Sequence, residues 1–326
     1  MATIKDIAKK ADVSTATVSR IINGKGEAKP ETIARVMKIV KELDYQPNKM
    51  AKSLRQRKSD LIAIIVPNLT NPFFAELANA IEIEANKHHL RVILCNTNDS
   101  REKVEYFLGN IVDNYALGAV ICTLKVTEND LEYLEDKGIH TVTIDRAYFE
   151  HRFSSINIDQ LNGAFIATTH LIERNARKIV LICGPKSEKM STERIKGYQL
   201  ALKSAGLTSQ KIVYGDYSLK SGYEIIEELL NKDYQFDGIH ASNDQMALGA
   251  LRCCLDNGLT IPKEVKIVGN DNLAIDHYSN PRLTSLSQMH EKVSQSVIKE
   301  LRASQKKGHQ PQKIVLSPEL FIRESS

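Results

Sequence analysis

The fold of the first part of the chain is decided by the stretch DVSTATVSRIING at residues 12–24. Ser14 can cap a helix here, because its hydroxyl accepts hydrogen bonds from the amides of the first turn. The helix is expected to end at Asn23-Gly24, since both residues accept the left-handed conformation that is common at helix ends. Its inward face is apolar and consists of Val18, Ile21 and Ile22.

A helix precedes this one and another follows it. Thr3 and Asp6 resemble a capping box at the start of the first helix, and residues 29–32 (Lys-Pro-Glu-Thr) open the third. The tight turn at residues 11–13 separates the first two helices. The apolar stripes of the outer helices are Ile4, Ile7, Ala8 and Ala11 in the first, and Ile33, Val36, Val40 and Leu43 in the third. This order of short helices is typical of a helix-turn-helix domain.

The exposed side of the second helix carries short residues and one guanidinium group: Thr15, Ala16, Thr17, Ser19 and Arg20. Short side chains let a helix enter the major groove of DNA, where an arginine can bond guanine O6 and N7 together. Residues 1–60 hold 14 Lys and Arg against 7 Asp and Glu, whereas the remaining residues hold 30 against 33. A small structural bundle would account for the helices but not for this basic charge. The pattern therefore predicts double-stranded DNA as a partner.

Several segments in this part of the chain are similar to the LacI/GalR family of repressors: residues 3–8, 13–20, 22–23, 43–48 and 51–54. Asp12 stands where many members of the family have glycine, but aspartate tolerates the positive φ of such a turn. The resemblance, which extends over the whole chain, implies a hinge helix at about residues 48–56 that is ordered only on operator DNA. Leu54 would be its wedge in the minor groove. The expected DNA contacts are Thr3, Ser14, Thr15, Ala16, Thr17, Ser19, Arg20, Asn23, Asn48, Ala51 and Leu54.

From residue 61 onward, apolar runs alternate with helix-patterned segments. The runs cover residues 61–66, 91–95, 119–122, 141–144, 179–183, 211–214, 238–240 and 265–268. This alternation predicts an α/β fold with parallel sheets built from β-α-β units. A fresh series of runs near residue 179 indicates two doubly wound lobes, and the resemblance implies lobes of the periplasmic-binding-protein type.

The domain organisation that follows has three parts. We expect a helix-turn-helix domain at residues 1–46, a hinge helix and linker at 47–60, and a two-lobed domain at 61–326 that binds an effector and dimerises. The N-lobe would hold about 61–160 and 290–320, and the C-lobe about 161–289 and 321–326. No heptad tail ends the sequence, which favours a homodimer over a tetramer. Two copies of the N-terminal domain would read a pseudo-palindromic operator.

Polar and aromatic residues follow the strands at the carboxyl ends, where a doubly wound fold binds its ligands. Amides, carboxylates and guanidinium groups suit a polyhydroxylated ring, and phenyl rings cover its C–H faces. Each residue taken singly could instead be a helix cap, a turn former, a core side chain or a surface charge. The candidates are Asn71, Phe73, Phe74, Asp145, Arg146, Arg194, Tyr217, Asn243, Asp271 and Gln288.

These candidates are also similar, position by position, to the sugar contacts of the ribose-type periplasmic binding proteins. That resemblance implies a small sugar as effector, with ribose or a related pentose expected. Tyr217 replaces a phenylalanine and would add a hydroxyl to one wall. Asn270 stands where the family often has an aromatic residue, so the choice among related sugars stays open.

Other classes of protein are disfavoured. The sequence contains no G-x-G-x-x-G after the first strand, no P-loop and no G-x-S-x-G elbow, so we expect that the protein is not an enzyme and needs no cofactor. His88, His89 and His170 lack metal-ligand partners at helical spacing, so we expect no metal site. The sequence predicts a cytoplasmic protein rather than a secreted sugar receptor. Its five cysteines form no C-x-x-C pair, and we find neither a membrane-length apolar run nor a leader. Two regulators with other effectors remain open: a carbon-control protein with a phosphoprotein co-effector, and a repressor that binds a purine.

Overall fold

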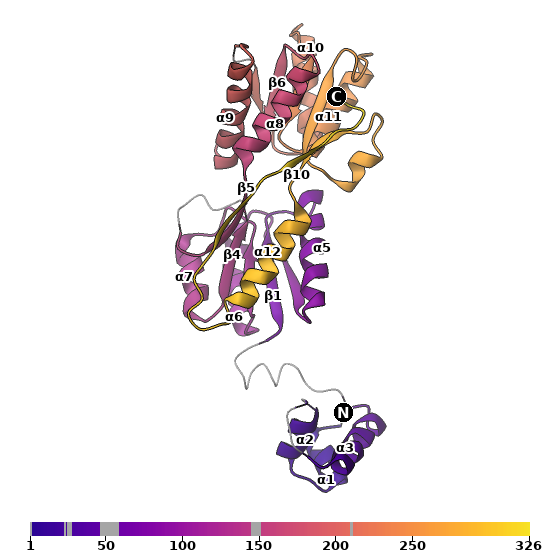
Figure 1. The fold of residues 1–326 in the computed structure, drawn as a ribbon, viewed down its shortest axis with the longest axis vertical. Helices are drawn as coiled ribbons and strands as arrows, with labels where there is room; N and C mark the ends of the chain where they lie inside the picture. The colour runs from indigo at the N-terminus through magenta and orange to yellow at the C-terminus, as the bar shows by residue number, and fades with distance from the viewer. Residues whose placement is uncertain (1, 23, 25–27, 46–58, 145–150, 209–210) are drawn as a thin grey trace. The chain divides into compact units, whose positions relative to one another are not determined.

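The computed structural model describes residues 2–22, 24, 28–45, 59–144, 151–208 and 211–326. Its internal contacts divide the chain into two compact units, Met1–Ser59 and Asp60–Ser326 (Figure 1). We call the first unit the head and the second the body. Within the described residues, no helix is long and apolar enough to cross a membrane.

Three helices are described in the head: α1 (Ile4–Ala11), α2 (Thr15–Ile22) and α3 (Pro30–Glu42). Thr3 and Asp6 form the predicted capping box, in which each backbone amide bonds to the other residue's side chain. Asp12 ends α1 with a φ of +49°, as its tolerance of this conformation allows. At the start of α2, the amide of Thr17 donates to Ser14 Oγ at 3.1 Å. Local capping thus sets where α1 and α2 begin and end.

The core of the head is small and apolar. Its buried members are Ile7, Ala8, Ala11, Val18, Val36 and Ile39. One expectation for the third helix was wrong, because Ile33 is 37% exposed and Ile39 is buried instead. Both side chains lie about 60° from Val36 around the helix axis, so the difference comes from position along the axis. Ile33 belongs to the first turn of α3, which extends past the small core.

The body contains two six-stranded sheets, one in each lobe. The N-lobe sheet has the order β11-β5-β4-β3-β1-β2, and its neighbouring strands are all parallel. Its strands are β1 (Leu61–Val66), β2 (Arg91–Asn96), β3 (Gly118–Ile121), β4 (His140–Ile144), β5 (Ser154–Ile158) and β11 (Lys313–Leu316). Helices α5 (Pro72–Lys87) and α12 (His290–Ala303) cover one face, and α6 (Arg101–Asp113) and α7 (Glu128–Asp136) cover the other.

The C-lobe sheet has the order β12-β10-β9-β8-β6-β7. Its strands are β6 (Ile179–Cys183), β7 (Ile212–Tyr214), β8 (Gly238–Ala241), β9 (Lys266–Asp271), β10 (Thr284–Ser287) and β12 (Glu319–Phe321). Helices α8 (Gln160–Glu173) and α9 (Lys189–Ser204) cover one face, and α10 (Leu219–Asn231) and α11 (Asp244–Asp256) the other. The sheet departs from the expected parallel pattern at its edge, where β12 runs antiparallel to β10.

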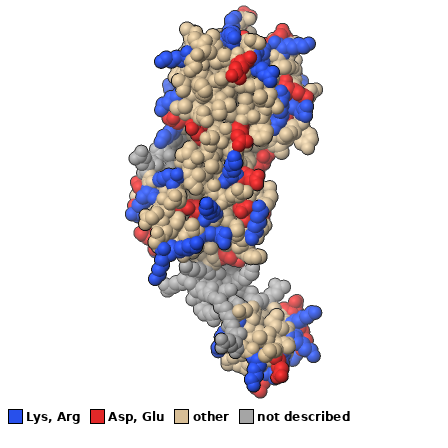
Figure 2. Space-filling model, viewed as in Figure 1, with Lys and Arg blue, Asp and Glu red and all other residues tan. Residues whose placement is uncertain are grey.

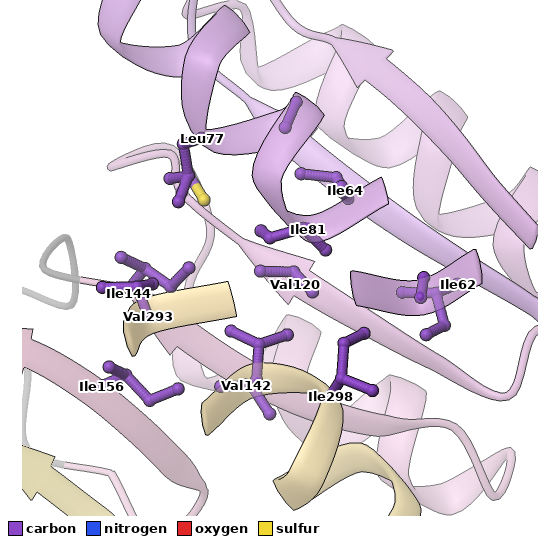
Figure 3. Close-up of a cluster of buried hydrophobic side chains, with 14 of the residues drawn as sticks. Ile62, Ile64, Leu77, Ile81, Val120, Val142, Ile144, Ile156, Val293 and Ile298 are labelled. Carbon is purple, nitrogen blue, oxygen red and sulfur yellow. The ribbon is translucent and has the colours of Figure 1, made fainter. Parts of the chain in front are cut away.

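The period of two along each central strand explains why helices cover both faces of each sheet. On β1, Ile62 and Ile64 point into a core shared with α5 and α12 (Figure 3), whereas Ala63 and Ile65 point to the opposite core. All four are completely buried.

The five cysteines are also buried and form no disulfide.

The chain passes between the lobes three times. These crossovers join β5 to α8, β10 to α12, and β11 to β12, and Figure 1 shows β5 and β10 at the junction of the two lobes. We expected the third crossing at about residues 320–321, but it precedes Glu319, the first residue of β12. The crossovers hold the carboxyl ends of both sheets toward each other, which places a ligand site between the lobes.

Candidate functional site

A pocket lies between the lobes of the body and encloses about 470 Å³ of space, counting its open side. The side chains that line it come from both lobes: Asn71, Phe73, Phe74, Leu77, Cys122, Ile144, Gln160, Met190, Arg194, Tyr217, Ser242, Asn243, Asp271 and Gln288.

The N-lobe wall of the pocket begins at the start of α5. Asn71 caps this helix, and its Oδ1 accepts a hydrogen bond from the amide of Phe73 at 3.1 Å. Asn71 is therefore both a helix cap and a pocket residue, so the two interpretations of this residue are compatible. The rings of Phe73 and Phe74 meet edge to face with centroids 5.0 Å apart, and Phe73 also contacts the ring of His290. The arrangement offers an aromatic surface to a ligand.

The C-lobe wall contains a buried arginine on α9. Arg194 is only 5% exposed, and its Nε donates to Gln160 Oε1 at 2.9 Å. Its Nη1 is buried and has no hydrogen-bond partner among the described residues, and the same is true of the Ser242 hydroxyl. Buried polar groups without partners cost free energy. Their place in the pocket lining indicates that a polar ligand supplies the missing partners.

Asp271, at the end of β9, faces the same pocket and is 7% exposed. Burial and the neighbouring Asp244 raise the pKa of Asp271 well above its usual value, although Arg194 opposes the shift. In its charged form this carboxylate can accept hydrogen bonds from two adjacent hydroxyl groups of a ligand, and such charge-assisted bonds are stronger than neutral ones.

Two further acids lie buried close to Asp271. Asp244 accepts hydrogen bonds from the Leu273 amide at 3.0 Å and the Ser285 hydroxyl at 2.5 Å. Asp276 is fully buried, and neither of its carboxyl oxygens meets a donor among the described residues. Burial and the adjacent Asp244 raise the pKa of Asp276 to about 10. Asp276 is therefore neutral at pH 7.

Tyr217 forms another part of the C-lobe wall. Its hydroxyl donates to Glu188 Oε2 at 2.8 Å, so this group is turned to a protein partner. Its φ is +68°, and its ring lies so close to Gly184 that a Cβ there would be 2.0 Å from the hydroxyl oxygen. Asn243 fixes the Tyr217 backbone, because Asn243 Nδ2 donates to the Tyr217 carbonyl at 2.9 Å. These contacts hold the ring against the pocket.

In the head, the predicted DNA contacts are distributed over the exposed surface of α2 and its cap. Ser14, Thr15, Ala16 and Arg20 are exposed, while Thr17 and Ser19 are half-buried. Thr3 is exposed in the capping box of α1. Lys and Arg side chains lie alongside acidic ones on the face of the head in Figure 2. Asn23, Asn48, Ala51 and Leu54 lie outside the described residues.

Two family models match the chain. "Bacterial regulatory proteins, lacI family" matches residues 3–48, and "Periplasmic binding proteins and sugar binding domain of LacI family" matches residues 59–322. The second model alone covers most of the chain. The chain belongs to the LacI family. The expected family and fold class are thus confirmed, and the protein is a DNA-binding transcription regulator with a small-molecule-binding body.

Curated LacI-family relatives span nearly the same length. Catabolite control protein A of Priestia megaterium is 34% identical over 88% of this chain and 87% of its own, and the ribose operon repressor of Halalkalibacterium halodurans is 34% identical over 88% and 86%. The repressor PurR of Actinobacillus pleuropneumoniae serotype 3 is 31% identical over 100% and 98%. These relatives are regulators of transcription, not enzymes.

A solved structure of a LacI-family regulator from Enterococcus faecium with bound ribose is also similar. It is 28% identical, covers 82% of this chain and 98% of its own, and superposes with a TM-score of 0.74. Within the described part of the present chain, no group of three or more His, Cys, Asp or Glu is placed to hold a metal ion.

The pocket brings together eight of the ten residues that we predicted to contact an effector: Asn71, Phe73, Phe74, Arg194, Tyr217, Asn243, Asp271 and Gln288. Asp145 and Arg146 lie outside the described residues. Our sequence interpretation missed Gln160 and Met190, which begin or nearly begin helices, and the apolar side chains Leu77, Cys122 and Ile144. Gln160 could have been found from its place after β5, had that polar strand been recognised.

Proposed function

We propose that this LacI-family regulator represses carbohydrate-utilisation genes and is controlled by ribose or a related pentose bound between the lobes. The observation that carries this proposal is the composition of the pocket. An aromatic pair lines the same pocket as a buried carboxylate, Asp271, and a buried guanidinium, Arg194, whose Nη1 lacks a partner among the described residues. A sugar hydroxyl both donates and accepts, so adjacent hydroxyls satisfy both groups while C–H faces contact Phe73 and Phe74.

The similarity to a ribose operon repressor and to a ribose-bound regulator supports a pentose as the ligand. Similarity of the same order to catabolite control protein A and to PurR leaves a phosphoprotein co-effector and a purine as the outcomes against which the proposal is tested. In our proposal ribose releases the protein from its operator, because a sugar that signals its own availability should relieve repression of the genes that consume it.

We further propose that the protein binds a pseudo-palindromic operator as a homodimer. The short, exposed face of α2, with Thr15, Ala16 and Arg20, would enter the major groove at each half-site. Exposed apolar side chains on β2, an edge strand of its sheet, support contact with a second copy of the chain. Ile93 and Leu94 are each 40% exposed.

A thermal-shift screen tests the effector. Purified protein is heated with ribose, other pentoses, hexoses, phosphosugars and purines, because a ligand that binds only the folded state raises its stability. At a hundredfold excess over the dissociation constant, ribose should stabilise the body by about 2.7 kcal/mol, a rise of roughly 5–10 °C. A rise with a purine alone would indicate a purine repressor. No rise with any compound would favour a phosphoprotein-dependent regulator.

A further inference from the structure

We infer that Gln160 is the positioning residue that couples occupation of the effector pocket to the arrangement of the two lobes. The inference rests on the proposed function, since it assigns a regulatory role within the same pocket. Gln160 is 9% exposed and lines that pocket. Gln160 lies at a crossover, and its side chain bonds to two other pocket residues, Arg194 and Gln288.

Gln160 links two of the three chain crossovers between the lobes. It is the first residue of α8, directly after the chain leaves β5 of the N-lobe. Gln288 directly follows β10 of the C-lobe and precedes α12, so it lies on the second crossover. Gln160 Nε2 donates to Gln288 Oε1 at 3.4 Å. The first and third crossovers are joined differently, by a backbone bond of 2.9 Å from the Asp159 amide to the Leu316 carbonyl.

The other end of the Gln160 amide binds the pocket arginine. Arg194 Nε donates to Gln160 Oε1 at 2.9 Å. A guanidinium group only donates, so Gln160 must present its oxygen to Arg194 and its nitrogen to Gln288. Gln288 must in turn present its oxygen to Gln160, which directs its own amide nitrogen elsewhere. The chain Arg194–Gln160–Gln288 therefore has one hydrogen-bonding direction, fixed by the arginine.

A bound ligand acts on both ends of this chain. Arg194 Nη1, which lacks a partner among the described residues, and Gln288 both line the pocket, so an oxygen of the ligand can bond to either end. Rotation of one lobe against the other must occur about the crossovers, because they are the segments that connect the lobes. A ligand that bonds to Arg194 or Gln288 changes the hydrogen bonds that these residues make with Gln160. It therefore favours one arrangement of the crossovers. Through Gln160 the ligand binds one arrangement of the lobes more tightly than the other, and this difference in affinity is what shifts the lobes.

The experiment measures the coupling factor, which is the ratio of the DNA dissociation constants with saturating ribose and without it. The DNA is a duplex selected by the full-length protein from a random-sequence library. Gln160→Met retains the length of the side chain and removes its hydrogen bonds to Arg194 and Gln288. Gln160→Glu retains the acceptor for Arg194, and Gln288 can turn its amide to donate to the new carboxylate. Met190→Ala, on the same helix as Arg194, is the matched control in the pocket lining.

For the wild-type protein the coupling factor should be on the order of 5–150. It should fall toward 1 in Gln160→Met, even at saturating ribose, and return most of the way in Gln160→Glu. Met190→Ala should raise the ribose concentration needed but leave the saturated factor unchanged. Gln288→Met, which removes the other end of the bond, should also lower the factor and serves if Gln160→Met does not fold.

Two outcomes contradict the inference and can be told apart. If wild-type protein responds to ribose and both Gln160→Met and Gln288→Met retain its full coupling factor, Gln160 has no positioning role and the proposed function stands. If the wild-type protein binds its duplex equally with and without ribose, the proposed function fails and the role of Gln160 fails with it.

Discussion

The head and the body bury different kinds of side chain. In the described part of the head, the buried side chains are six apolar ones, and the candidate DNA contacts are on the outside. The body buries charged and polar groups beside its pocket, among them Arg194, Asp244, Asp271 and Asp276. The polar groups of the head are on its surface, where water can solvate them when no DNA is bound. The body buries these groups beside its pocket, where a polar ligand can bond to those that lack a partner among the described residues.

This difference predicts where substitutions act. A change in the pocket should remove the response to the effector and leave DNA binding intact. A change in the small core of the head should remove DNA binding and leave effector binding intact.

Asp271→Ala should have the largest effect, on ribose binding. Loss of two charge-assisted hydrogen bonds at about 1.5–3 kcal/mol each should weaken ribose binding by at least a hundredfold. Calorimetric titration of ribose measures the loss, and binding of the ribose-free variant to operator DNA should stay within about threefold of wild type, a difference below 1 kcal/mol. An equal fall in DNA affinity would make Asp271 a structural residue of the body.

Ile7→Ala should unfold the head while the body keeps its ligand. Ile7 is fully buried in a core of six side chains, so the cavity should cost about 2–5 kcal/mol, comparable to the stability of so small a unit. DNA binding should be lost, and the thermal shift with ribose should persist. The matched control is Ile33→Ala, since Ile33 is 37% exposed and should matter by less than about 0.5 kcal/mol. Retention of DNA binding by Ile7→Ala would contradict the prediction.

Arg20→Ala should weaken operator binding by about 1–3 kcal/mol and relax the preference at one base pair of each half-site, because the guanidinium of this exposed residue would read a guanine. Ribose affinity of the free protein should not change. Selection from a DNA library measures the preference. If the preferred sequence stays the same and only the salt dependence decreases, Arg20 contacts phosphate rather than a base.

Asp276→Asn should change how stability depends on pH. The pKa of Asp276 is raised to about 10, so between pH 7 and pH 9 the folded protein holds a proton that the unfolded chain has released. Stability of the wild-type protein should therefore fall as pH rises, by about 1.4 kcal/mol per pH unit from this group. The asparagine amide can donate to Asp244 without titrating, so urea unfolding at pH 7 and pH 8 should show a shallower decline in the variant. Identical slopes would show that Asp276 ionises normally.

Sequence reasoning worked best where structure is local. Thr3, Asp6 and Ser14 act within three or four residues of their own position and have the predicted roles in capping, and Asp12 has the positive φ expected at the turn. Ile33 was misjudged because periodicity gives the direction of a side chain but not how far along the helix the core extends. In the body, the rule that ligands bind at strand ends located Asn71, Asn243 and Asp271 without coordinates.

The contacts that sequence could not supply are those between distant segments. Gln160 and Arg194 are 34 positions apart and Gln160 and Gln288 are 128 apart, so their hydrogen bonds depend on how two lobes close over three crossovers. The hydroxyl of Tyr217 was expected to belong to one wall of the pocket. It donates to Glu188, which no local pattern connects to it. β5 escaped notice because its sequence, Ser154–Ile158, mixes serine and asparagine with isoleucine.

We propose that binding of a sugar in the body is linked to binding of DNA by the head, and a reciprocal titration tests this linkage most directly. Ribose is titrated calorimetrically into the full-length protein alone and into its complex with the selected duplex. Linkage requires that DNA change the ribose dissociation constant by the same factor by which ribose changes that of DNA. We predict weaker ribose binding in the complex, by about 5–150-fold. Equal ribose affinity with and without the duplex would contradict the account.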